Sequence, residues 1–305
     1  MARHINLSAS PPRRGAASGA IRIGFAFMPS LPPIVLTFAA SDPTGGAGLQ
    51  ADILTLASMG CHPLSVVTAL TVQDTRGVDD VLAIDSDWVV DQARKLLEDM
   101  PVAAFKLGVL GSIENITAIA EIISDYPEVP VILDPVLASG RGDTLAGEDM
   151  IIALRELIVP QTTVLTPNSM EARRLAEEDE EGDDPGLDEC ASRLVTLGCE
   201  FVLITGTHEN TPEVINTLYG EDGVVRSDRW KRLQGSFHGS GCTLASAIAA
   251  TMANGLDVPE AVREAQEYTW QALMHGFRPG MGQQIPDRLF WAREDQQPDE
   301  RTTDD

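Results

Sequence analysis

Short runs rich in β-branched residues alternate with longer amphipathic stretches from residue 34 onward. Apolar runs of this length are typical of strands buried on both faces, and the stretches between them are long enough for the helices that connect parallel strands. This alternation predicts an α/β sandwich around a central, mostly parallel sheet, and it limits the fold more than any other feature of the chain.

The expected strands are residues 34–39, 64–71, 104–110, 129–134, 163–166 and 200–204, followed by a hairpin-like pair near 214–219 and 223–226. The expected helices are residues 48–59, 88–99, 113–124, 148–157, 169–177, 188–197, 240–254 and 259–275. One domain, residues 33–292, accounts for all of these elements.

The two ends of the chain are expected to lie outside this domain. Residues 1–32 are interpreted as a disordered leader, in which the stretch before Met28 is rich in arginine and has no acidic residue. That composition resembles an organellar transit peptide, but we favour a disordered extension or a start codon placed ahead of Met28. Residues 293–305 are interpreted as an acidic disordered tail.

The charge and the cysteines limit the possible partners. The chain has 22 Lys and Arg residues against 46 Asp and Glu residues, a formal charge of −24, so nucleic acid and anionic membranes would repel it. No apolar run approaches the roughly 18 residues that span a bilayer. The four cysteines form no CxxC pair. We therefore expect a cytoplasmic protein with no nucleic-acid or membrane partner.

Polar or glycine-rich residues follow several expected strands. In open α/β sheets, ligands bind outside the carboxyl ends of the strands, so these segments are the candidate site. They are residues 40–48, 72–75, 134–136, 167–171 and 205–207.

The segment His238-Gly239-Ser240-Gly241-Cys242-Thr243 runs directly into an expected helix of small residues. A glycine-rich turn at a helix N-terminus offers free amides and the positive end of the helix dipole, which together suit a transferring phosphoryl group. A tight helix-entry turn with no ligand is the competing interpretation.

Cys242 falls in the first turn of this helix. The helix dipole favours its thiolate and nearby phosphates oppose it, so the sequence leaves the charge of the sulfur open. Cys242 is a candidate to accept the proton of an attacking hydroxyl, or to orient that hydroxyl. The other three cysteines are interpreted as small buried hydrophobic residues.

Gln73 follows the second expected strand, where its carboxamide can both donate to and accept from the edge of an aminopyrimidine. A capped loop residue is the alternative. Asp134, Asn168 and Glu171 supply oxygen ligands suited to Mg²⁺ near phosphates. Asn168 and Glu171 also form an ordinary capping-box pattern, and both interpretations can hold.

Three segments together, residues 41–52, 68–78 and 238–243, closely resemble the hydroxymethylpyrimidine/phosphomethylpyrimidine kinases of thiamine biosynthesis, and the resemblance spans nearly all of residues 34–291. It implies a ribokinase-like three-layer α/β/α sandwich without a separate lid domain, usually a homodimer. It also implies two successive phosphorylations with ATP and Mg²⁺.

The resemblance assigns roles to particular residues. Cys242, Gly239 and Gly241 are implied to be catalytic, and Asp134 and Glu171 to hold the metal. The residues implied to contact the pyrimidine are Gln73, Ala40, Asp42, Ala47, Asp52 and Val109, and those implied to contact the nucleotide are Asn168, Thr205, Gly206 and Ser240.

The chain departs from the family pattern in three places. Ala40 replaces a frequent glycine, residues 138–143 lack a frequent Ala-Lys-Ser-Gly form, and residues 205–208 replace a frequent Lys-Gly-Gly-His form. The role of the missing lysine then passes to Arg141. These departures bear on the nucleotide contacts more than on the fold.

Three alternative functions remain open at this point: a pyridoxal or pyridoxine kinase, a hydroxyethylthiazole kinase, and a non-catalytic pyrimidine sensor. Gln73 and the loop at residues 45–52 favour the pyrimidine as substrate. The intact phosphate segment at residues 239–242 argues against a sensor, because a pure binding protein has little need for it.

Overall fold

The computed structural model describes residues 31–138, 142, 145–177 and 185–293. The expected leader up to residue 30, the expected tail from residue 294, the acidic loop at residues 178–184 and the expectation for Arg141 lie outside the described residues. The described elements belong to one unit that begins at Pro32.

The core of this unit is a nine-stranded sheet with the order β3-β2-β1-β4-β5-β6-β7-β8-β9. The six strands from β2 to β7 run parallel, and antiparallel strands complete both edges. The strands are β1 (Ile34–Ser41), β2 (His62–Gln73), β3 (Val78–Ala83), β4 (Ala104–Leu107), β5 (Val131–Leu133), β6 (Val164–Leu165), β7 (Phe201–Ile204), β8 (Glu213–Gly220) and β9 (Gly223–Lys231).

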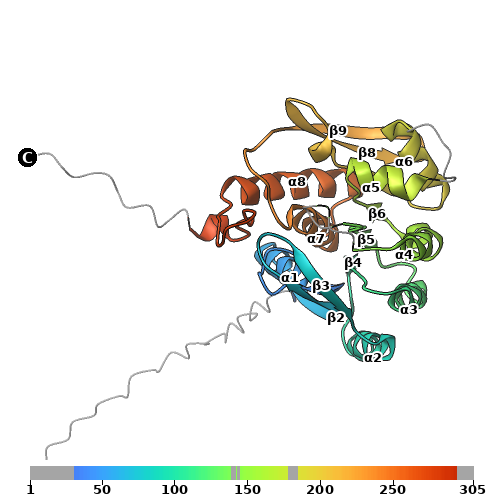
Figure 1. Ribbon diagram of the computed structural model, residues 1–305. Helices are drawn as coiled ribbons and strands as arrows, with labels where there is room; N and C mark the ends of the chain where they lie inside the picture. Colours follow the sequence, from blue (N-terminus) through green and yellow to red (C-terminus); the bar gives the residue numbers. More distant parts are fainter. Residues whose placement is uncertain (1–30, 139–141, 143–144, 178–184, 294–305) are drawn as a thin grey trace, which may run out of the picture. The chain divides into compact units, whose positions relative to one another are not determined.

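Helices cover both faces of the sheet (Figure 1). One face carries α1 (Gly48–Ser58), α7 (Ser240–Ala253) and α8 (Val258–Met274), and their apolar side chains form one core cluster with the sheet. The other face carries α2 (Ser86–Leu97), α3 (Ile113–Ser124), α4 (Glu148–Ala153), α5 (Ser169–Ala176) and α6 (Leu187–Thr196), which form the second cluster. The predicted three-layer, mostly parallel architecture is therefore confirmed.

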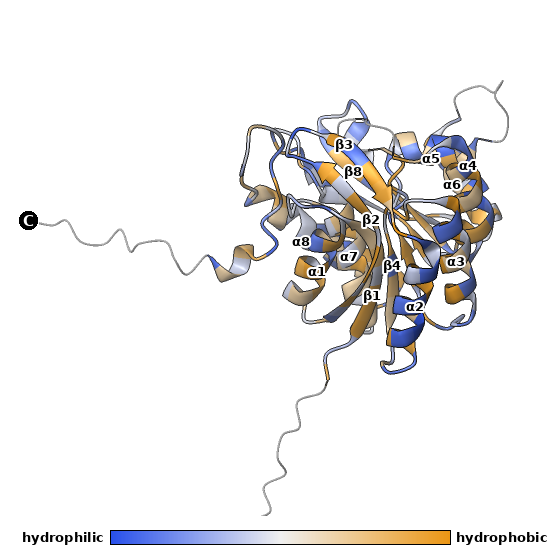
Figure 2. Ribbon diagram, turned by 60° about the horizontal axis from the view of Figure 1, so that its bottom comes forward, coloured by the Kyte–Doolittle hydropathy of each residue, from blue (hydrophilic) through white to orange (hydrophobic). Residues whose placement is uncertain are grey.

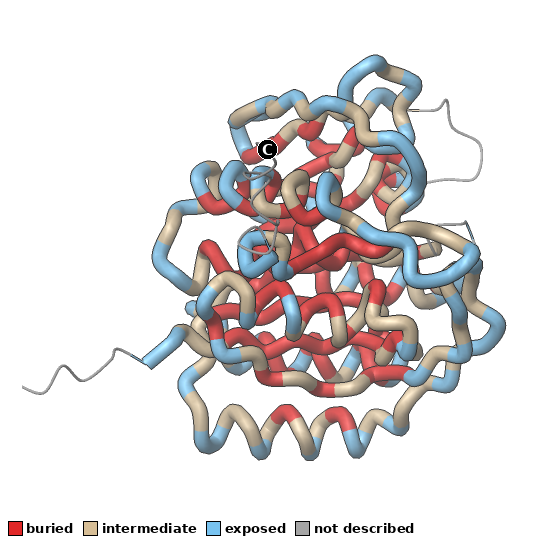
Figure 3. The backbone as a smooth tube through the Cα atoms, turned by 90° about the vertical axis from the view of Figure 1, so that its left-hand side faces the viewer, coloured by how far each residue is buried: buried red, intermediate tan, exposed pale blue. Residues whose placement is uncertain are grey.

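Burial explains why these segments form these elements. Every residue of β4, β5 and β6 is buried, as expected for strands covered by helices on both faces. Figure 2 shows β1 and β4 as mostly hydrophobic ribbon, and Figure 3 shows the buried backbone in the interior of the fold. α7 is rich in small residues, which allow it to pack closely on β1, β4 and β5.

The structure differs from the sequence prediction in a few elements. The sequence pattern does not predict β3. This half-exposed edge strand contains two aspartates, and it is held in place by its pairing with β2. The helix expected at residues 148–157 is α-helical only to Ala153 and continues as a π-helical turn, Leu154–Ile158. No helix of the described residues is long and apolar enough to cross a membrane.

Candidate active site

The predicted site residues lie along the carboxyl ends of the parallel strands. Gln73 ends β2, Asp42 follows β1, and Asp134 follows β5. Val109, Asn168 and Thr205 lie just beyond β4, β6 and β7. Because these six strands are neighbours in the sheet, residues spread over much of the chain share one edge.

The N-terminus of α7 is built as an anion site. Gly239 is its N-cap residue with φ 83°, and a Cβ there would lie 1.8 Å from the carbonyl oxygen of Gly46, so only glycine fits. The first hydrogen bond within the helix runs from the Thr243 amide to the Gly239 carbonyl. The amides of Ser240, Gly241 and Cys242 therefore precede the helical hydrogen-bond ladder, and we call this segment, residues 239–242, the cradle.

Asp42 organises the loop that faces the cradle. Its carboxylate accepts hydrogen bonds from the Thr44 amide at 2.8 Å, the Thr44 hydroxyl at 3.0 Å and the Ala47 amide at 2.8 Å. His238 Nε2 lies 2.8 Å from the same carboxylate. With Asp42 only 3% exposed, its oxygens shape the loop rather than face open solvent.

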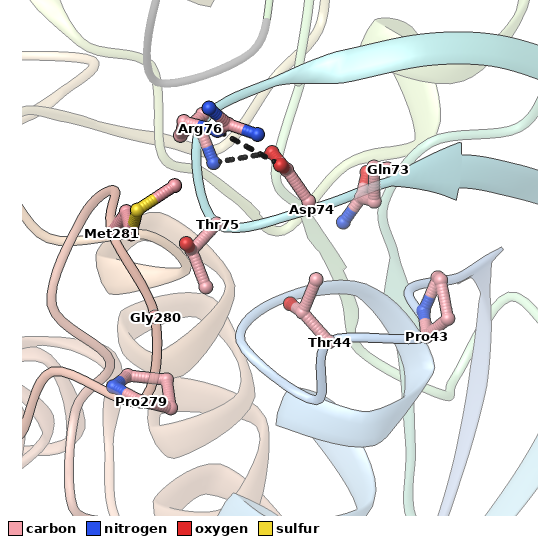
Figure 4. Close-up of a pocket in the computed structure, with 9 residues that line it drawn as sticks. All are labelled: Pro43, Thr44, Gln73, Asp74, Thr75, Arg76, Pro279, Gly280 and Met281. Atoms are coloured by element: carbon pink, nitrogen blue, oxygen red, sulfur yellow. Dashed lines mark hydrogen bonds and ion pairs between the residues drawn. The ribbon is translucent and has the colours of Figure 1, made fainter.

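Gln73 lies beside the cradle. Its Nε2 atom is 3.3 Å from Nε2 of His238, the residue that immediately precedes Gly239. Gln73 also borders a hollow of about 430 Å³, which is a volume typical of small-molecule sites. Figure 4 shows Gln73 and Thr44 on one side of this hollow and the loop at 279–281 on the other. Its lining residues are Pro43, Thr44, Gln73, Asp74, Thr75, Arg76, Pro279, Gly280 and Met281.

A buried ion pair lies on the same edge of the sheet. The ammonium of Lys106, on β4, is 2.9 Å from Asp52 on α1, and both side chains are completely buried. Asp52 also accepts hydrogen bonds from Thr37 and Ser246. Burial alone would lower the pKa of Lys106, but Asp52 raises it above the ordinary value, so Lys106 is charged. Asp52 is expected from the sequence to contact the pyrimidine. In this conformation its carboxylate binds Lys106, Thr37 and Ser246 instead, and it has no exposed surface for a substrate.

The thiol of Cys242 is neutral in this environment. Burial raises its pKa well above the usual range, the charge of Asp134 adds to this, and Lys106 only partly offsets it. Desolvation and the charge of Asp134 therefore favour the protonated thiol over the thiolate.

Asp134 and Glu171 fit the predicted metal site. Oδ2 of Asp134 is buried and has no hydrogen-bond partner, and burial raises the pKa of this carboxyl group although Lys106 opposes the shift. Burial and the charge of Asp134 raise the pKa of Glu171 to about 8. A divalent cation would stabilise these two neighbouring carboxyl groups, because the charge of Asp134 raises the pKa of Glu171 and one buried oxygen of Asp134 has no hydrogen-bond partner.

Glu171 also has a structural role. It accepts hydrogen bonds from the backbone amides of Asn168 and Leu137, and with Asn168 it forms a capping box at the start of α5. Both sequence interpretations of this pair are therefore compatible with the geometry.

The predicted nucleotide residues form a neighbouring group. Asn168 and Thr205 pair as an isolated parallel bridge. The Gly206 amide donates to the side chain of Asn216, and a Cβ on Gly206 would lie 2.3 Å from the carbonyl oxygen of Ile215. The group connects to the metal residues through Asn168, which shares the capping box with Glu171.

Sequence reasoning missed Lys106, Asn216 and Arg288. A lysine inside the apolar run of β4 was a usable signal, because a buried ammonium needs a partner. Arg288 and Asn216 carried no such signal. Ala47 lies in the loop after β1, whereas Ala40, expected in that loop, is the penultimate residue of β1, because the strand pairs with β2 as far as Ser41. The Val109 carbonyl accepts a hydrogen bond from the Thr68 hydroxyl.

The charge of Asp42 should make the free energy of unfolding depend on pH in the acid range. Burial alone would raise its pKa, but hydrogen bonds from His238 and Thr44 outweigh this effect and lower the pKa from 3.8 to about 2. Because the pKa is lower in the folded state, the carboxylate stabilises the fold above about pH 4, and this stability is lost as the pH falls towards about 2. We expect Asp42→Asn to lack this part of the acid dependence, which is roughly 2 kcal/mol in all and roughly 1 kcal/mol between about pH 6 and about pH 3. Urea unfolding from about pH 6 to about pH 3 measures it, and equal slopes for variant and wild type would contradict it.

Comparison with known proteins gives consistent matches. A family model described as phosphomethylpyrimidine kinase matches residues 42–287. A hydroxymethylpyrimidine/phosphomethylpyrimidine kinase of Streptomyces coelicolor is 38% identical over 257 residues, which cover 83% of this chain and 93% of the relative. The crystal structure of a phosphomethylpyrimidine kinase from Clostridium difficile is 32% identical with a TM-score of 0.68, and covers 79% of this chain and 99% of its own. A pyridoxal kinase of Staphylococcus aureus, in complex with AMP-PCP and pyridoxal, is 26% identical with a TM-score of 0.76, and covers 86% of this chain and 96% of its own.

Proposed function

This chain belongs to the phosphomethylpyrimidine kinase family and is a phosphotransferase, and on that premise we propose that it uses ATP to phosphorylate 4-amino-5-hydroxymethyl-2-methylpyrimidine and then the resulting monophosphate. The observation that carries this proposal is the position of Gln73. A carboxamide suited to a pyrimidine edge lies 3.3 Å from the residue that precedes the phosphoryl cradle. This distance supports a site in which substrate recognition lies next to phosphoryl transfer.

In this proposal the pyrimidine occupies the hollow beside Gln73, with its hydroxymethyl arm directed towards α7. The hydroxyl oxygen attacks the γ-phosphoryl of ATP in line, the bond from the γ-phosphorus to the β-phosphate oxygen breaks, and the hydroxyl proton passes late to an oxygen of the transferred phosphoryl group. The amides of the cradle donate to the oxygens of the transferring group, where negative charge accumulates. Asn168, Thr205 and Gly206 hold the nucleotide.

Asp134 and Glu171 would hold Mg²⁺, which would neutralise charge on the phosphates. The fit rests on the orphaned Oδ2 atom of Asp134 and on the raised pKa of Glu171. Among the described residues no three potential metal-ligating side chains come together. A site with two carboxylates suits Mg²⁺, which usually keeps several waters and binds substrate phosphates.

We assign Cys242 the role of orienting the attacking hydroxyl. A neutral thiol can donate a hydrogen bond or accept one from the hydroxyl, but it cannot take up the hydroxyl proton. In a loose phosphoryl-transfer transition state the attacking hydroxyl keeps most of its proton until late, so correct orientation contributes more than early deprotonation.

Gln73→Ala should weaken binding of the pyrimidine selectively. Loss of hydrogen bonds to a polar ring edge costs roughly 1–2 kcal/mol, so we expect KM for the pyrimidine to rise about tenfold while KM for ATP changes little. The matched control is Gln92→Ala, which removes an exposed carboxamide that bonds the Trp88 carbonyl on α2. Steady-state kinetics with each substrate varied in turn would test the role, and an equal rise in both KM values would contradict it.

A substrate panel tests the function itself. ATP consumption with Mg²⁺ should be measured with the hydroxymethylpyrimidine, its phosphate, pyridoxal and hydroxyethylthiazole. Pyridoxal is the second candidate substrate, because solved pyridoxal kinases share this fold. We expect the two pyrimidines to be preferred; a preference for pyridoxal would reassign the enzyme, and no turnover with any of them would leave a sensor.

We also propose that the chain forms a homodimer through the edge of the sheet at β2 and β3. Leu70 and Leu82 face each other across these strands and are 45% and 64% exposed, and Val72 on the same face of β2 is 61% exposed. An apolar surface of this kind on a two-stranded edge favours a protein partner. Light scattering of the protein in solution would test the proposal.

A further inference from the structure

Arg288 is a buried cation that the mechanism above does not use. It lies beyond α8 and is 3% exposed. Its Nη2 atom donates to the carbonyl of Gly46 at 2.5 Å, its Nη1 atom lies 3.4 Å from the carbonyl of Gly45, and its Nε atom donates to the Thr243 hydroxyl at 3.1 Å. One guanidinium thus contacts both the loop that follows β1 and the first turn of α7.

The contacts continue into the cradle itself. The Thr243 hydroxyl donates to the carbonyl of Gly239 at 2.7 Å, and Nη2 of Arg288 lies 3.5 Å from the same carbonyl. In a turn whose amides face an anion, the carbonyls point the other way and concentrate negative partial charge there. A rigid guanidinium with five donors suits several such carbonyls better than any other side chain.

The two loops are in direct contact at this point. A Cβ on Gly46 would lie 2.4 Å from the ring of His238, and a Cβ on Gly239 would meet the Gly46 carbonyl. Neither loop can shift without moving the other or breaking a bond to Arg288. The distance between the loop at residues 43–48 and the cradle is therefore fixed by this group of contacts.

We propose that Arg288 is a positioning residue that holds the substrate loop, residues 43–48, against the phosphoryl cradle, residues 239–242, and so sets the distance between the attacking hydroxyl and the phosphoryl group. The proposal rests on the proposed kinase function. A displacement of about 1 Å between reacting groups can cost on the order of a hundredfold in rate. Arg288 therefore acts on transfer rather than on the affinity for either substrate.

The backbone of Arg288 is anchored separately from its side chain. The hydroxyls of Tyr268 and Ser58 both donate to the Arg288 carbonyl, at 2.8 and 2.7 Å. Tyr268→Phe removes one anchor of the same segment and leaves the guanidinium contacts in place. It is therefore the matched control for a merely structural role.

The test compares wild type, Arg288→Met, Arg288→Lys and Tyr268→Phe. For Arg288→Met we expect kcat to fall roughly tenfold or more with both KM values nearly unchanged, and phosphorylated product to fall below the ATP consumed, because water competes once the loops separate. Arg288→Lys should recover part of kcat, since it keeps the charge and one donor direction. Amide hydrogen exchange at residues 43–48 and 239–242 should rise together in Arg288→Met. Tyr268→Phe should match wild type in the ratio of phosphorylated product to ATP consumed and in hydrogen exchange at both segments.

The outcomes separate this inference from the proposed function. A wild-type protein with no turnover on the substrate panel would refute the function, and hydrogen exchange alone would then decide the role of Arg288. Wild-type exchange at both segments in Arg288→Met, or a product-to-ATP ratio equal to that of wild type, would overturn the inference. If Arg288→Met does not fold, Arg288→Lys decides: unchanged kcat and exchange overturn the proposal, and a reduced kcat with unchanged KM values supports it.

Discussion

Replacing Lys106 by methionine is expected to destabilise the folded protein by about 3–5 kcal/mol, because the change leaves a buried carboxylate without its cation. Lys106 and Asp52 are both completely buried, and their charged atoms are 2.9 Å apart. Thr37 and Ser246 still donate to Asp52 in the variant, but two hydroxyl groups do not replace a full positive charge. Urea unfolding at neutral pH, extrapolated to water, measures the loss.

Two further variants show whether the unpaired charge is the cause. The double variant Lys106→Met with Asp52→Asn removes both charges and should regain most of the lost stability, because the amide oxygen can accept from one of the two hydroxyl groups and the amide NH2 can donate to the other. Lys95→Met removes a lysine that pairs with Glu98 at the surface, where its side chain is 84% exposed, and should change stability by less than about 1 kcal/mol. If Lys106→Met and Lys95→Met lower the free energy of unfolding by the same amount, the buried ion pair stabilises the fold no more than a surface ion pair does.

Replacing Cys242 by alanine is expected to lower kcat about a hundredfold while both KM values stay close to those of wild type. The reason is the position of its side chain, in the first turn of α7, within the cradle and next to Asp134. Without a side-chain group there, the substrate hydroxyl samples orientations that do not point at the phosphoryl group. Initial rates at saturating ATP and pyrimidine give kcat directly.

Serine and aspartate at position 242 distinguish orientation from proton transfer. Serine keeps a neutral group that forms hydrogen bonds and should retain most of kcat. Aspartate adds a second carboxylate close to Asp134 in a buried site and should be impaired, because like charges repel strongly there. If instead aspartate restores turnover and serine resembles alanine, Cys242 is the proton acceptor and the orienting role is wrong.

Much of the fold followed from local patterns. The sequence predicts eight strands and eight helices of the sandwich within a few residues of where they lie. The reason is that the spacing of apolar residues and the length of each apolar run depend on how a strand or helix is buried in a parallel sheet covered on both faces. β3 escaped this reasoning, since an edge strand with Asp79 and Asp80 has neither an apolar run nor strict alternation. Its conformation depends on hydrogen bonds to β2, which local sequence does not encode.

The candidate site was predictable in part for the same reason. Glycines at a helix entry and polar residues after strands are local signals, and they pointed to Gly239, Gln73 and Asp134. The partners of these residues come from distant parts of the chain. Arg288 contacts Gly46 across 242 positions, and no local pattern marks such a pair.

The sequence by itself determined that this chain forms a mostly parallel α/β sandwich of the phosphomethylpyrimidine kinase family, because strand periodicity and the glycine segments are properties of neighbouring residues. Only the tertiary structure decided the charges at the site: which buried cation pairs with Asp52, that the Cys242 thiol is protonated, and that one guanidinium joins two glycine loops. Burial and long-range pairing set these properties, since a pKa depends on desolvation and on charges brought close by folding.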